Sequence, residues 1–483
     1  MEINNNRKDW ALEKLGDFAD YEKGKKPKNE SPIQNDIFKY PYVNIQAFEK
    51  GIIETYTDGE KCNFCSENDF LMVWDGSRFG LIGKGIKGAL GSTLMRINFP
   101  GIENHFAYYF LKSKYLEINS KPKGTGTPHV NSELLWNYIF PIAPLPEQRS
   151  IVSKIEQLFS DLDNGIENFK KAQAQLKLYR QSVLKASCEG KLVPTEAELA
   201  KAGGRDYEPA DVLLARIMKE NREKSSKGAK YKEHVAPDTS GLTALPEGWK
   251  WINLGQITWS VRDGPHYSPK YVKEGIPFIS GGNVRPNGVD FANAKRITPE
   301  LHSELSKRCK PEKGDILYTK GGTTGIARVN TYDFEFNVWV HVAVLKLAKS
   351  VEPFYIQHAL NSRFCYAQSQ RFTHGVGNQD LGLTRMVNIM LGFPPLAEQR
   401  RIVAEVERRL SVSDKMEATI TESLQKAESL RQSILKKAFE GKLLDKRELE
   451  KARNAPDWEP AEKLLERIKA EKMKIKTTNK DKK

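Results

Sequence analysis

The sequence has few cysteines and no long run of apolar residues. Its 483 residues include five cysteines, at Cys62, Cys65, Cys188, Cys309 and Cys365. A sparse, odd number of cysteines in a long chain predicts reduced thiols rather than a disulfide framework. No stretch of about 18 or more apolar residues occurs, so we expect no membrane span. The opening residues MEINNNRKDW lack the apolar segment of a signal peptide. We therefore expect a cytoplasmic protein.

The motifs of common catalytic and cofactor sites are also missing. The eight histidines are scattered, without HExxH or Ser/His/Asp spacing. No glycine-rich cofactor loop is paired with an Asn-Pro-Pro-aromatic motif, so we do not expect this chain to transfer methyl groups. Cys62 and Cys65 have the spacing of metal ligands, but no second Cys or His pair accompanies them. We expect ordinary thiols near a turn, and neither a metal, a cofactor nor a catalytic residue in this chain.

Positive charge is what the sequence has in excess. The net charge is +14, from 76 Lys and Arg against 62 Asp and Glu, which favours a polyanionic partner. Two glycine-rich segments, residues 83–88 and 320–325, do not match the GxxxxGK[ST] loop of nucleotide-binding proteins. Each is either a plain turn or a loop whose main-chain N–H groups approach the phosphates of DNA.

The chain contains a long internal repeat. LPEQRSIVSKIE begins at Leu145 and LAEQRRIVAEVE at Leu396, an offset of 251 residues. At this offset, residues 145–220 and 396–471 share 27 identities in 76 positions without a gap, which indicates a duplication. The segments before each copy are more distant relatives. We align the segment starting at Trp10 with the one at Trp251, Lys39 with Gly275, and Asn68 with Gly314.

Each repeated segment predicts a long helix. Apolar residues recur in steps of three and four over 146–190 and 397–441, and Gly190 and Gly441 terminate the pattern. Such a helix is about 65 Å long and exposes its apolar stripe unless another helix covers it. We expect the two copies to pair as an antiparallel coiled coil, which would relate the two halves by a pseudo-twofold axis. Two separate amphipathic helices are the alternative.

The segments between the helices predict α+β domains. Short β-branched and aromatic runs alternate with Gly, Pro and Asn turns. Residues 272–279 and 315–319 are expected strands, and residues 106–116 and 353–364 are expected helices. Residues 219–240 are rich in Lys, Ser, Glu and Gly and are typical of a surface linker or frayed helix end.

The two Glu-Gln-Arg openings, each followed by a heptad helix ending in Glu-Gly-Lys-Leu, resemble the specificity subunit of type I restriction–modification systems. The resemblance covers nearly the whole chain. It implies an α+β protein with target-recognition domains at 1–144 and 244–394. It also implies a central conserved region at 145–243 and a C-terminal one at 395–483, whose long helices pair.

The resemblance further implies that each domain recognises one half of a bipartite, asymmetric site in double-stranded DNA. The helices would set the spacing of the half-sites and dock two methyltransferase (modification) subunits, and restriction (motor-nuclease) subunits would join them. Adenine methylation, translocation and cleavage would belong to those partners, which would bind S-adenosylmethionine, ATP and Mg²⁺. The chain alone would be no enzyme. A self-sufficient nuclease or methyltransferase, and a coiled-coil scaffold that binds only protein, are the alternative functions.

Candidate DNA contacts are basic and amide side chains with their polar neighbours in turns, since Lys and Arg hold phosphates while Asn, Gln, Arg and His bind base edges. In the first domain they are Lys23, Lys25, Lys26, Lys28, Arg78, Lys84, Lys87, Lys121, Lys123, Thr125, Thr127 and His129. In the second they are Arg262, His266, Tyr267, Asn283, Arg285, Lys320, Thr323, His374, Asn378 and Gln379. The loops 121–131 and 371–380 are the strongest candidates, because each combines glycine with polar side chains and precedes its repeat by the same distance.

The triplets Glu147, Gln148, Arg149 and Glu398, Gln399, Arg400 open the two helices. A glutamate in the first turn suits the helix dipole, which favours a capping role. Capping alone does not require Gln and Arg in both copies. We therefore expect a mixture of structural contacts and contacts with partner subunits.

Overall fold

The chain forms two compact units that each combine distant parts of the sequence. The computed structural model describes residues 7–124, 126–225, 234–375 and 379–480. Unit 1 consists of Met1–Phe169 and Thr421–Lys483, and unit 2 consists of Lys170–Ile420. Both divisions lie within a long helix, 251 residues apart, which is the offset of the repeat. Unit 2 therefore spans one repeat period, whereas unit 1 joins the two ends of the chain. The four successive domains expected from the sequence stay a prediction.

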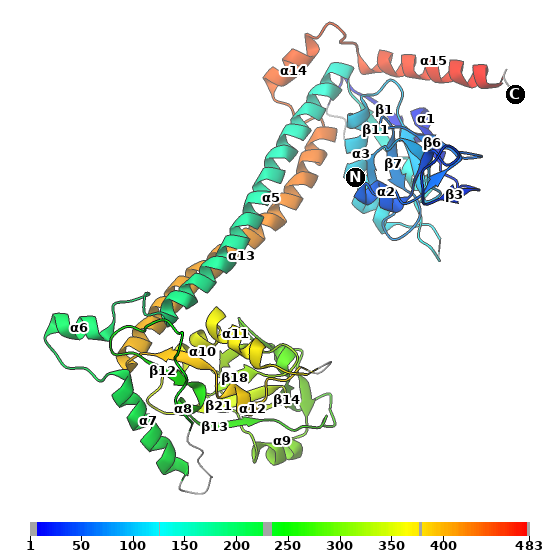
Figure 1. Ribbon diagram of the computed structural model, residues 1–483. Helices are drawn as coiled ribbons and strands as arrows, with labels where there is room; N and C mark the ends of the chain where they lie inside the picture. The colour runs from blue at the N-terminus through cyan, green and yellow to red at the C-terminus, as the bar shows by residue number, and fades with distance from the viewer. Residues whose placement is uncertain (1–6, 125, 226–233, 376–378, 481–483) are drawn as a thin grey trace. The chain divides into compact units, whose positions relative to one another are not determined.

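Unit 1 contains the first head, which we define as β1 to β11 (Figure 1). Its strands form a four-stranded sheet in the order β2-β10-β7-β8, a mixed five-stranded sheet β3-β5-β4-β9-β6, and the pair β1-β11. The strands are β1 (Ala11–Lys14), β2 (Asp20–Lys23), β3 (Glu30–Ser31), β4 (Tyr40–Val43), β5 (Tyr56–Thr57), β6 (Phe64–Cys65), β7 (Phe70–Val73), β8 (Ile82–Lys84), β9 (Gly88–Leu90), β10 (Leu94–Asn98) and β11 (Ile139–Ile142). The helices are α1 (Leu15–Phe18), α2 (Ile45–Lys50), α3 (Asn104–Ser120) and α4 (Ser132–Trp136).

Unit 2 contains the second head, β12 to β22, with a related topology. Its sheets have the orders β13-β21-β18-β19, β17-β14-β20, β15-β16 and β12-β22. The strands are β12 (Lys250–Asn253), β13 (Thr258–Asp263), β14 (Ile276–Ile279), β15 (Val284–Arg285), β16 (Gly288–Val289), β17 (Lys295–Ile297), β18 (Ile316–Thr319), β19 (Ala327–Val329), β20 (Asn337–Val338), β21 (Val342–Leu347) and β22 (Met390–Phe393). The helices are α8 (Leu254–Ile257), the 3-10 helix η1 (Gly281–Asn283), α9 (Pro299–Ser306), α10 (Pro353–Leu360), α11 (Arg363–Phe372) and α12 (Leu383–Met386).

The strand register corrects one part of the sequence alignment. Ala11 pairs with Ile142 in the first head, and Lys250 pairs with Phe393, which lies one repeat offset later, in the second. Ala11 and Lys250 are therefore equivalent, and so are the residues before them, Trp10 and Trp249. The expected match of Trp10 with Trp251 is wrong. Leu15 lies five positions after Trp10, and Leu254 lies five positions after Trp249, so no gap is needed between the two segments.

The long helices are α5 (Leu145–Cys188) and α13 (Leu396–Phe439), and they pair antiparallel within each unit (Figure 1). In unit 1, Arg431 forms an ion pair with Asp163. In unit 2, the Arg180 guanidinium lies 2.7 Å from an Asp414 carboxylate oxygen. Each helix is followed, two residues after its end, by a glycine with a left-handed backbone, Gly190 (φ 65°) and Gly441 (φ 68°). The predicted fold class is confirmed: α+β heads with paired long helices.

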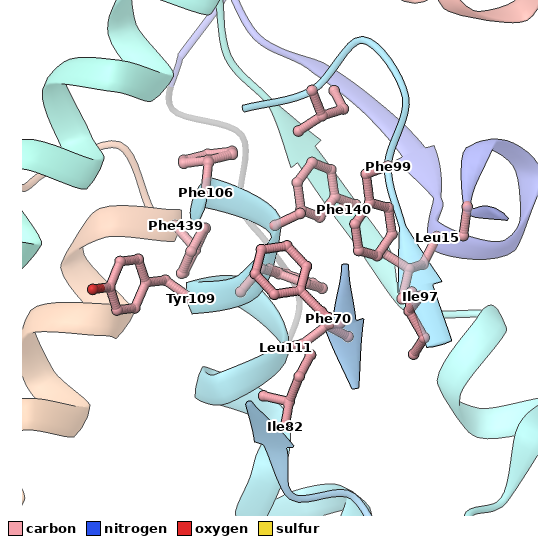
Figure 2. Packing of buried hydrophobic residues seen from close by; sticks show 14 of the residues in the cluster. Leu15, Phe70, Ile82, Ile97, Phe99, Phe106, Tyr109, Leu111, Phe140 and Phe439 are labelled. Atoms are coloured by element: carbon pink, nitrogen blue, oxygen red, sulfur yellow. The ribbon is translucent and has the colours of Figure 1, made fainter. Parts of the chain in front are cut away.

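The end of α13 completes the core of the first head. Figure 2 shows Phe439 directed toward Phe106 of α3, and the two ring centroids are 5.1 Å apart. Phe439 also contacts Phe110 edge-on at 5.3 Å, and Phe110 contacts Phe140 of β11 at 4.8 Å. Two further helices of the same unit, α14 (Lys446–Arg453) and α15 (Ala461–Lys480), follow, and Leu464 of α15 is buried in this core.

The end of α5 completes the core of the second head in the same way. Val183 and Leu184 of α5 are buried together with Leu213 and Ile217 of α7 (Ala210–Ser225). The short helix α6 (Glu196–Gly203) connects α5 to α7. Each head is therefore completed by the end of a long helix that lies outside it in the sequence. For the first head this is α13, near the C-terminus, and for the second head it is α5, which ends about 60 residues before β12.

Several local predictions needed adjustment. The strand expected over 272–279 begins only at Ile276, while the strand at 315–319 and the helix at 106–116 are present as β18 and α3. The helix expected over 353–364 is broken after Leu360, because the Ser362 side chain accepts a hydrogen bond from the Cys365 N–H and starts α11. In the segment 219–240, α7 extends to Ser225, and residues 226–233 lie outside the described part. Within the described ranges, none of the helices combines the length and apolarity needed to cross a membrane.

A buried histidine makes the stability of unit 2 dependent on pH. Burial in α10, together with the nearby Arg328 charge, lowers the pKa of His358 to about 4. The unfolded imidazole binds a proton below about pH 6.5, whereas the folded one stays neutral. Stability is therefore fully present above about pH 6.5 and is lost as the pH decreases toward 4, by up to about 3 kcal/mol. We expect His358→Leu to abolish this loss in hydrogen exchange of unit 2 between pH 7.5 and 5. His374→Leu, which removes an exposed histidine of the same unit, should leave the loss unchanged.

Candidate nucleic-acid interface

A loop closed by the same pair of main-chain hydrogen bonds precedes α4 in the first head and α12 in the second. In the first head, the Lys123 N–H donates to the His129 carbonyl at 3.0 Å, and the His129 N–H donates back at 3.3 Å. In the second head, His374 and Asp380 exchange the same two hydrogen bonds at 3.1 and 2.9 Å. These pairs lie one repeat offset apart, so the ungapped register of the duplication already begins in these loops.

A second loop, at the end of the central strand, is joined to the first in both heads. In the first head, the Gly76 N–H donates to Pro128 and the Val130 N–H donates to Trp74, both at 2.9 Å. In the second head, the Gly322 N–H donates to Gln379 at 3.3 Å and the Leu381 N–H donates to Lys320 at 2.8 Å. We call this pair of joined loops the loop framework. Its described residues are 74–80 with 121–124 and 126–131 in the first head, and 320–325 with 371–375 and 379–381 in the second.

The two copies of the loop framework hold different side chains at equivalent positions. The main-chain hydrogen bonds equate Trp74 with Lys320 and His129 with Asp380. They also equate Lys123 with His374. The main-chain hydrogen bonds are therefore shared, whereas the side chains at equivalent positions differ in whether they donate or accept hydrogen bonds.

The strand end beside the loop framework carries an ion pair of opposite polarity in the two heads. Lys23 at the end of β2 lies 2.9 Å from the Asp75 carboxylate. The position equivalent to Lys23 is Asp263 at the end of β13. Lys23 pairs with Met95 and Asp263 with Ala343. Met95 and Ala343 in turn pair with Met72 and Tyr318, which each lie two residues before the equivalent Trp74 and Lys320. Asp263 lies 3.4 Å from the Lys320 ammonium.

In the second head, this ion pair is part of a buried cluster. Asp263 is buried and accepts a 2.9 Å hydrogen bond from Arg308, and the His266 ring nitrogen lies 3.3 Å away. The Lys320 ammonium also donates to Asp380 at 2.8 Å, and the Lys320 side chain is only 4% exposed. The expectation that Lys320 contacts a DNA phosphate does not fit this burial, since its charge is already balanced by two carboxylates.

The other candidate contacts lie at the surface in different places. The exposed residues are Lys23, Lys25, Lys26, Lys28, Arg78, Lys84, Lys87, Lys121, Lys123, Thr127, Arg262, His266, Tyr267, Arg285, Thr323, His374 and Gln379, and His129 is half-buried. Thr125 and Asn378 lie outside the described residues. Lys84 pairs in register with Phe70, at the opposite end of β7 from the loop framework, so the fold does not bring it together with the loops. Asn283 is half-buried and accepts from the Ser280 N–H at 2.9 Å, which is a structural role.

Three residues of this region were missed in the sequence. Asp263, Arg308 and Asp380 lie among the candidate contacts but were not selected. A search for DNA contacts favours cations and amides, and Arg308 is distant in sequence from both loops. The only available signal was the position of Asp380 directly after Gln379 in a candidate loop.

The Glu-Gln-Arg triplets anchor each long helix to its head. The Gln148 amide donates to the Ala143 carbonyl at 2.6 Å and accepts from the Glu103 N–H, before α3, at 2.8 Å. Gln399 repeats this arrangement with the Pro394 carbonyl at 2.8 Å and the Glu352 N–H, before α10, at 3.0 Å. Each glutamine is fully buried, so it joins three segments of the fold through main-chain groups.

The glutamates of the triplets are buried as well. Glu398 accepts from the Trp249 indole at 2.9 Å and from the Glu196 N–H at 2.8 Å. Glu147 lies 2.8 Å from Arg7, and the equivalent indole of Trp10 is its further partner. Burial raises the pKa of both carboxyls. Such burial corrects the expectation that Glu and Gln face a partner subunit.

Only the arginines of the triplets reach the surface. Arg149 is paired with Asp457 at 2.7 Å, and Arg400 is exposed. Contact of these two arginines with partner subunits stays a prediction.

We expect Gln148→Ala to destabilise unit 1 and Gln399→Ala to destabilise unit 2, each by about 1–3 kcal/mol. Each change leaves a buried N–H and a buried carbonyl without their partner. Hydrogen exchange of the intact chain measures the two units separately. Gln157→Ala, which removes an exposed glutamine of α5, is the matched control, and equal effects of all three variants would contradict the anchoring role.

The described residues contain no group of three or more His, Cys, Asp or Glu side chains arranged to hold a metal. All five cysteines are free thiols. The Cys65 thiol is buried and donates to the Ile86 carbonyl at 3.0 Å, and burial raises its pKa to about 12. Cys65 is therefore a protonated thiol in this structure.

Two α+β heads with one loop framework and diverged polar side chains, each closed by a remote helix end, define a duplicated recognition protein. Comparison with known proteins gives this class its family. Residues 7–173 and 246–426 match the model of the type I restriction modification DNA specificity domain. The chain belongs to this family and is a specificity subunit of a type I restriction–modification system.

Relatives support this assignment over most of their length. The EcoBI specificity subunit of Escherichia coli is 25% identical over 442 residues, covering 89% of this chain and 86% of the relative. The MjaVIII specificity subunit of Methanocaldococcus jannaschii is 24% identical over 445 residues, covering 90% and 93%. A chain in a solved structure that describes complex assembly and conformational transition of the type I R-M system has the same fold. It aligns with a TM-score of 0.61 and 20% identity over 90% of this chain and 98% of its own. The HsdS subunit of Thermoanaerobacter tengcongensis aligns with a TM-score of 0.50 and 19% identity, also over 90% and 98%.

Proposed function

We propose that each head recognises one half of a bipartite, asymmetric site in double-stranded DNA. The observation that carries this proposal is the loop framework, whose main-chain hydrogen bonds are the same in both heads while its side chains differ. A common backbone suits a common mode of approach to the duplex, and different side chains suit different base sequences. The proposed DNA contacts in or beside the loop framework are Lys123, Thr127 and His129 in the first head and His266, His374 and Gln379 in the second.

We propose that the paired helices dock two methyltransferase subunits and set the spacing of the half-sites. Apolar side chains remain uncovered on these helices, including Leu178 (72% exposed) and Met416 (52% exposed) in unit 2. In unit 1, a groove of about 480 Å³ between the helices is lined by Leu162, Ile166 and Leu430. Uncovered apolar surface of this kind is typical of a protein interface.

In this proposal the chain itself is not catalytic. The methyltransferase subunits would bind S-adenosylmethionine and methylate adenine. The restriction subunits would use ATP and Mg²⁺ to translocate and cleave unmodified DNA. The free thiols are consistent with the cytoplasmic location proposed for the complex.

The test is to mix the purified chain with its modification subunits and map the methylated adenines by sequencing. We expect methylation at one bipartite sequence, and only when the chain is present. Methylation that ignores sequence, or that does not need the chain, would refute the proposal.

Two simple assays separate the alternatives. A self-sufficient enzyme would methylate or cleave DNA when the chain alone is incubated with S-adenosylmethionine or Mg²⁺, whereas we expect no turnover. A scaffold that binds only protein would not bind DNA. A DNA-recognition subunit should bind DNA with an affinity that decreases steeply as salt increases.

A further inference from the structure

We propose that Asp380 determines base specificity in the second head, by accepting a hydrogen bond from the amino group of cytosine or adenine in the major groove. The inference rests on the proposed function and specifies its chemistry. Asp380 closes the candidate loop 374–380 through its main chain, and the Asp380 side chain stays 45% exposed at the loop framework. The carboxylate is therefore both held in place and accessible.

Lys320 fixes the orientation of this carboxylate. Its buried ammonium donates to Asp380 Oδ1 at 2.8 Å and lies 3.4 Å from Asp263 Oδ2. The Lys320 main chain is also bonded to this loop, since the Leu381 N–H donates to the Lys320 carbonyl at 2.8 Å. A buried ammonium thus orients an exposed carboxylate, which is the kind of support that a specific base contact needs.

The charges around Asp380 make a carboxylate tolerable beside DNA. Two carboxylates, Asp263 and Asp380, are accompanied by the cations of Lys320 and Arg308, with His266 next to Asp263. The two carboxylates are therefore balanced by two cations. An isolated aspartate would be repelled by the phosphates, whereas this one carries little net penalty.

The chemistry of a carboxylate restricts which bases it can face. An ionised carboxylate only accepts hydrogen bonds. In the major groove, cytosine N4 and adenine N6 are donors, whereas guanine O6 and N7 and thymine O4 are acceptors. Asp380 would therefore favour cytosine or adenine at one position and disfavour guanine and thymine there.

The first head supplies an internal comparison. The position equivalent to Asp380 is His129, whose ring can donate as well as accept, and Trp74 replaces Lys320. The first head therefore lacks the oriented carboxylate at this point of its loop framework. The carboxylate of Asp75, 2.9 Å from Lys23, lies at a different position of that framework. We therefore expect the preference that Asp380 confers to map to the half-site of the second head.

The experiment is selection of bound sequences from random DNA by the chain assembled with its modification subunits. For Asp380→Asn we expect the preference at one position of one half-site to decrease roughly tenfold or more, because the amide also donates. All other positions should keep their preferences. Asp380→Glu retains the carboxylate and should retain the cytosine or adenine preference at reduced affinity. The matched control is Asp333→Asn, which removes an exposed carboxylate of the same head that is paired with Lys313.

Distinct outcomes would overturn this inference. If Asp380→Asn leaves every base preference unchanged, or weakens binding equally for all sequences, Asp380 has a structural or electrostatic role only. Thermal unfolding of the variant complexes shows whether a loss of binding reflects a loss of folding, and in that case the Asp380→Glu selection alone decides. Failure of the proposed function looks different, because the unaltered chain would then select no sequence.

Discussion

Phe439→Ala is expected to destabilise unit 1 by about 3–5 kcal/mol and to leave unit 2 unchanged. Phe439 lies 297 residues after Ile142, the last residue of the head that it completes, and its ring packs against Phe106 and Phe110 of α3. Its removal leaves a cavity among aromatic side chains that are fixed by β11 and α3, so the site cannot collapse easily. The equivalent position in unit 2 is Cys188, at the end of α5, and it is untouched by the change.

Hydrogen exchange followed by mass spectrometry measures this effect. Protection should decrease in residues 7–169 and 421–480 together, although these segments lie at opposite ends of the sequence. Phe64→Ala, which removes a phenylalanine of the first head that is 41% exposed, is the matched control and should destabilise unit 1 much less. A loss of protection limited to residues 421–480 would show that the first head folds without the end of α13.

Exchange of the first head is expected to change one half of the recognised DNA sequence and to leave the other half intact. Residues 1–140 would be replaced by the corresponding residues of a related specificity subunit. The loop framework of the first head lies entirely within this segment, whereas the second copy lies in unit 2. Methylated sites mapped by sequencing, with the modification subunits added, give both half-sites in one measurement.

The design of the exchange must respect the core of unit 1. The foreign head has to accept Phe439 from α13 and Leu464 from α15, both of which are buried in the first head. A second chimera that also takes residues 421–483 from the donor is therefore the matched control. If both chimeras change the two half-sites, the heads do not recognise DNA independently.

The sequence predicted the architecture better than the site. The duplication, the two long helices and their glycine ends follow from periodicity and repeated letters, which are local or directly visible. The equivalence of Trp10 with Trp249 was missed, because two tryptophans occur within three residues and only strand pairing with β11 and β22 separates them. The part played by residues 421–483 in the first head was not foreseen, since an apolar helix stripe does not identify what covers it.

Within the site, burial was the missing information. Lys320 is of the residue type that contacts phosphates, but its ammonium is paired with the carboxylates of Asp263 and Asp380, which lie in two other segments of the chain. The glutamates and glutamines of the triplets look like surface residues at a helix start, yet they are among the most buried polar side chains. Sequence reasoning places charged residues at the surface by default, which is correct for most of them but not for those that join segments.

Gln148 and Gln399 bear on how new DNA specificities can arise. Each glutamine side chain bonds to one main-chain carbonyl oxygen and one main-chain N–H group. Every amino acid has such a carbonyl, and every amino acid except proline has such an N–H group. The attachment therefore places little demand on the side chains of the head beside it. A gene recombining at this joint would keep these main-chain hydrogen bonds in a foreign head, so that the fit of the core around Phe439 and Leu464 becomes the remaining requirement of the exchange.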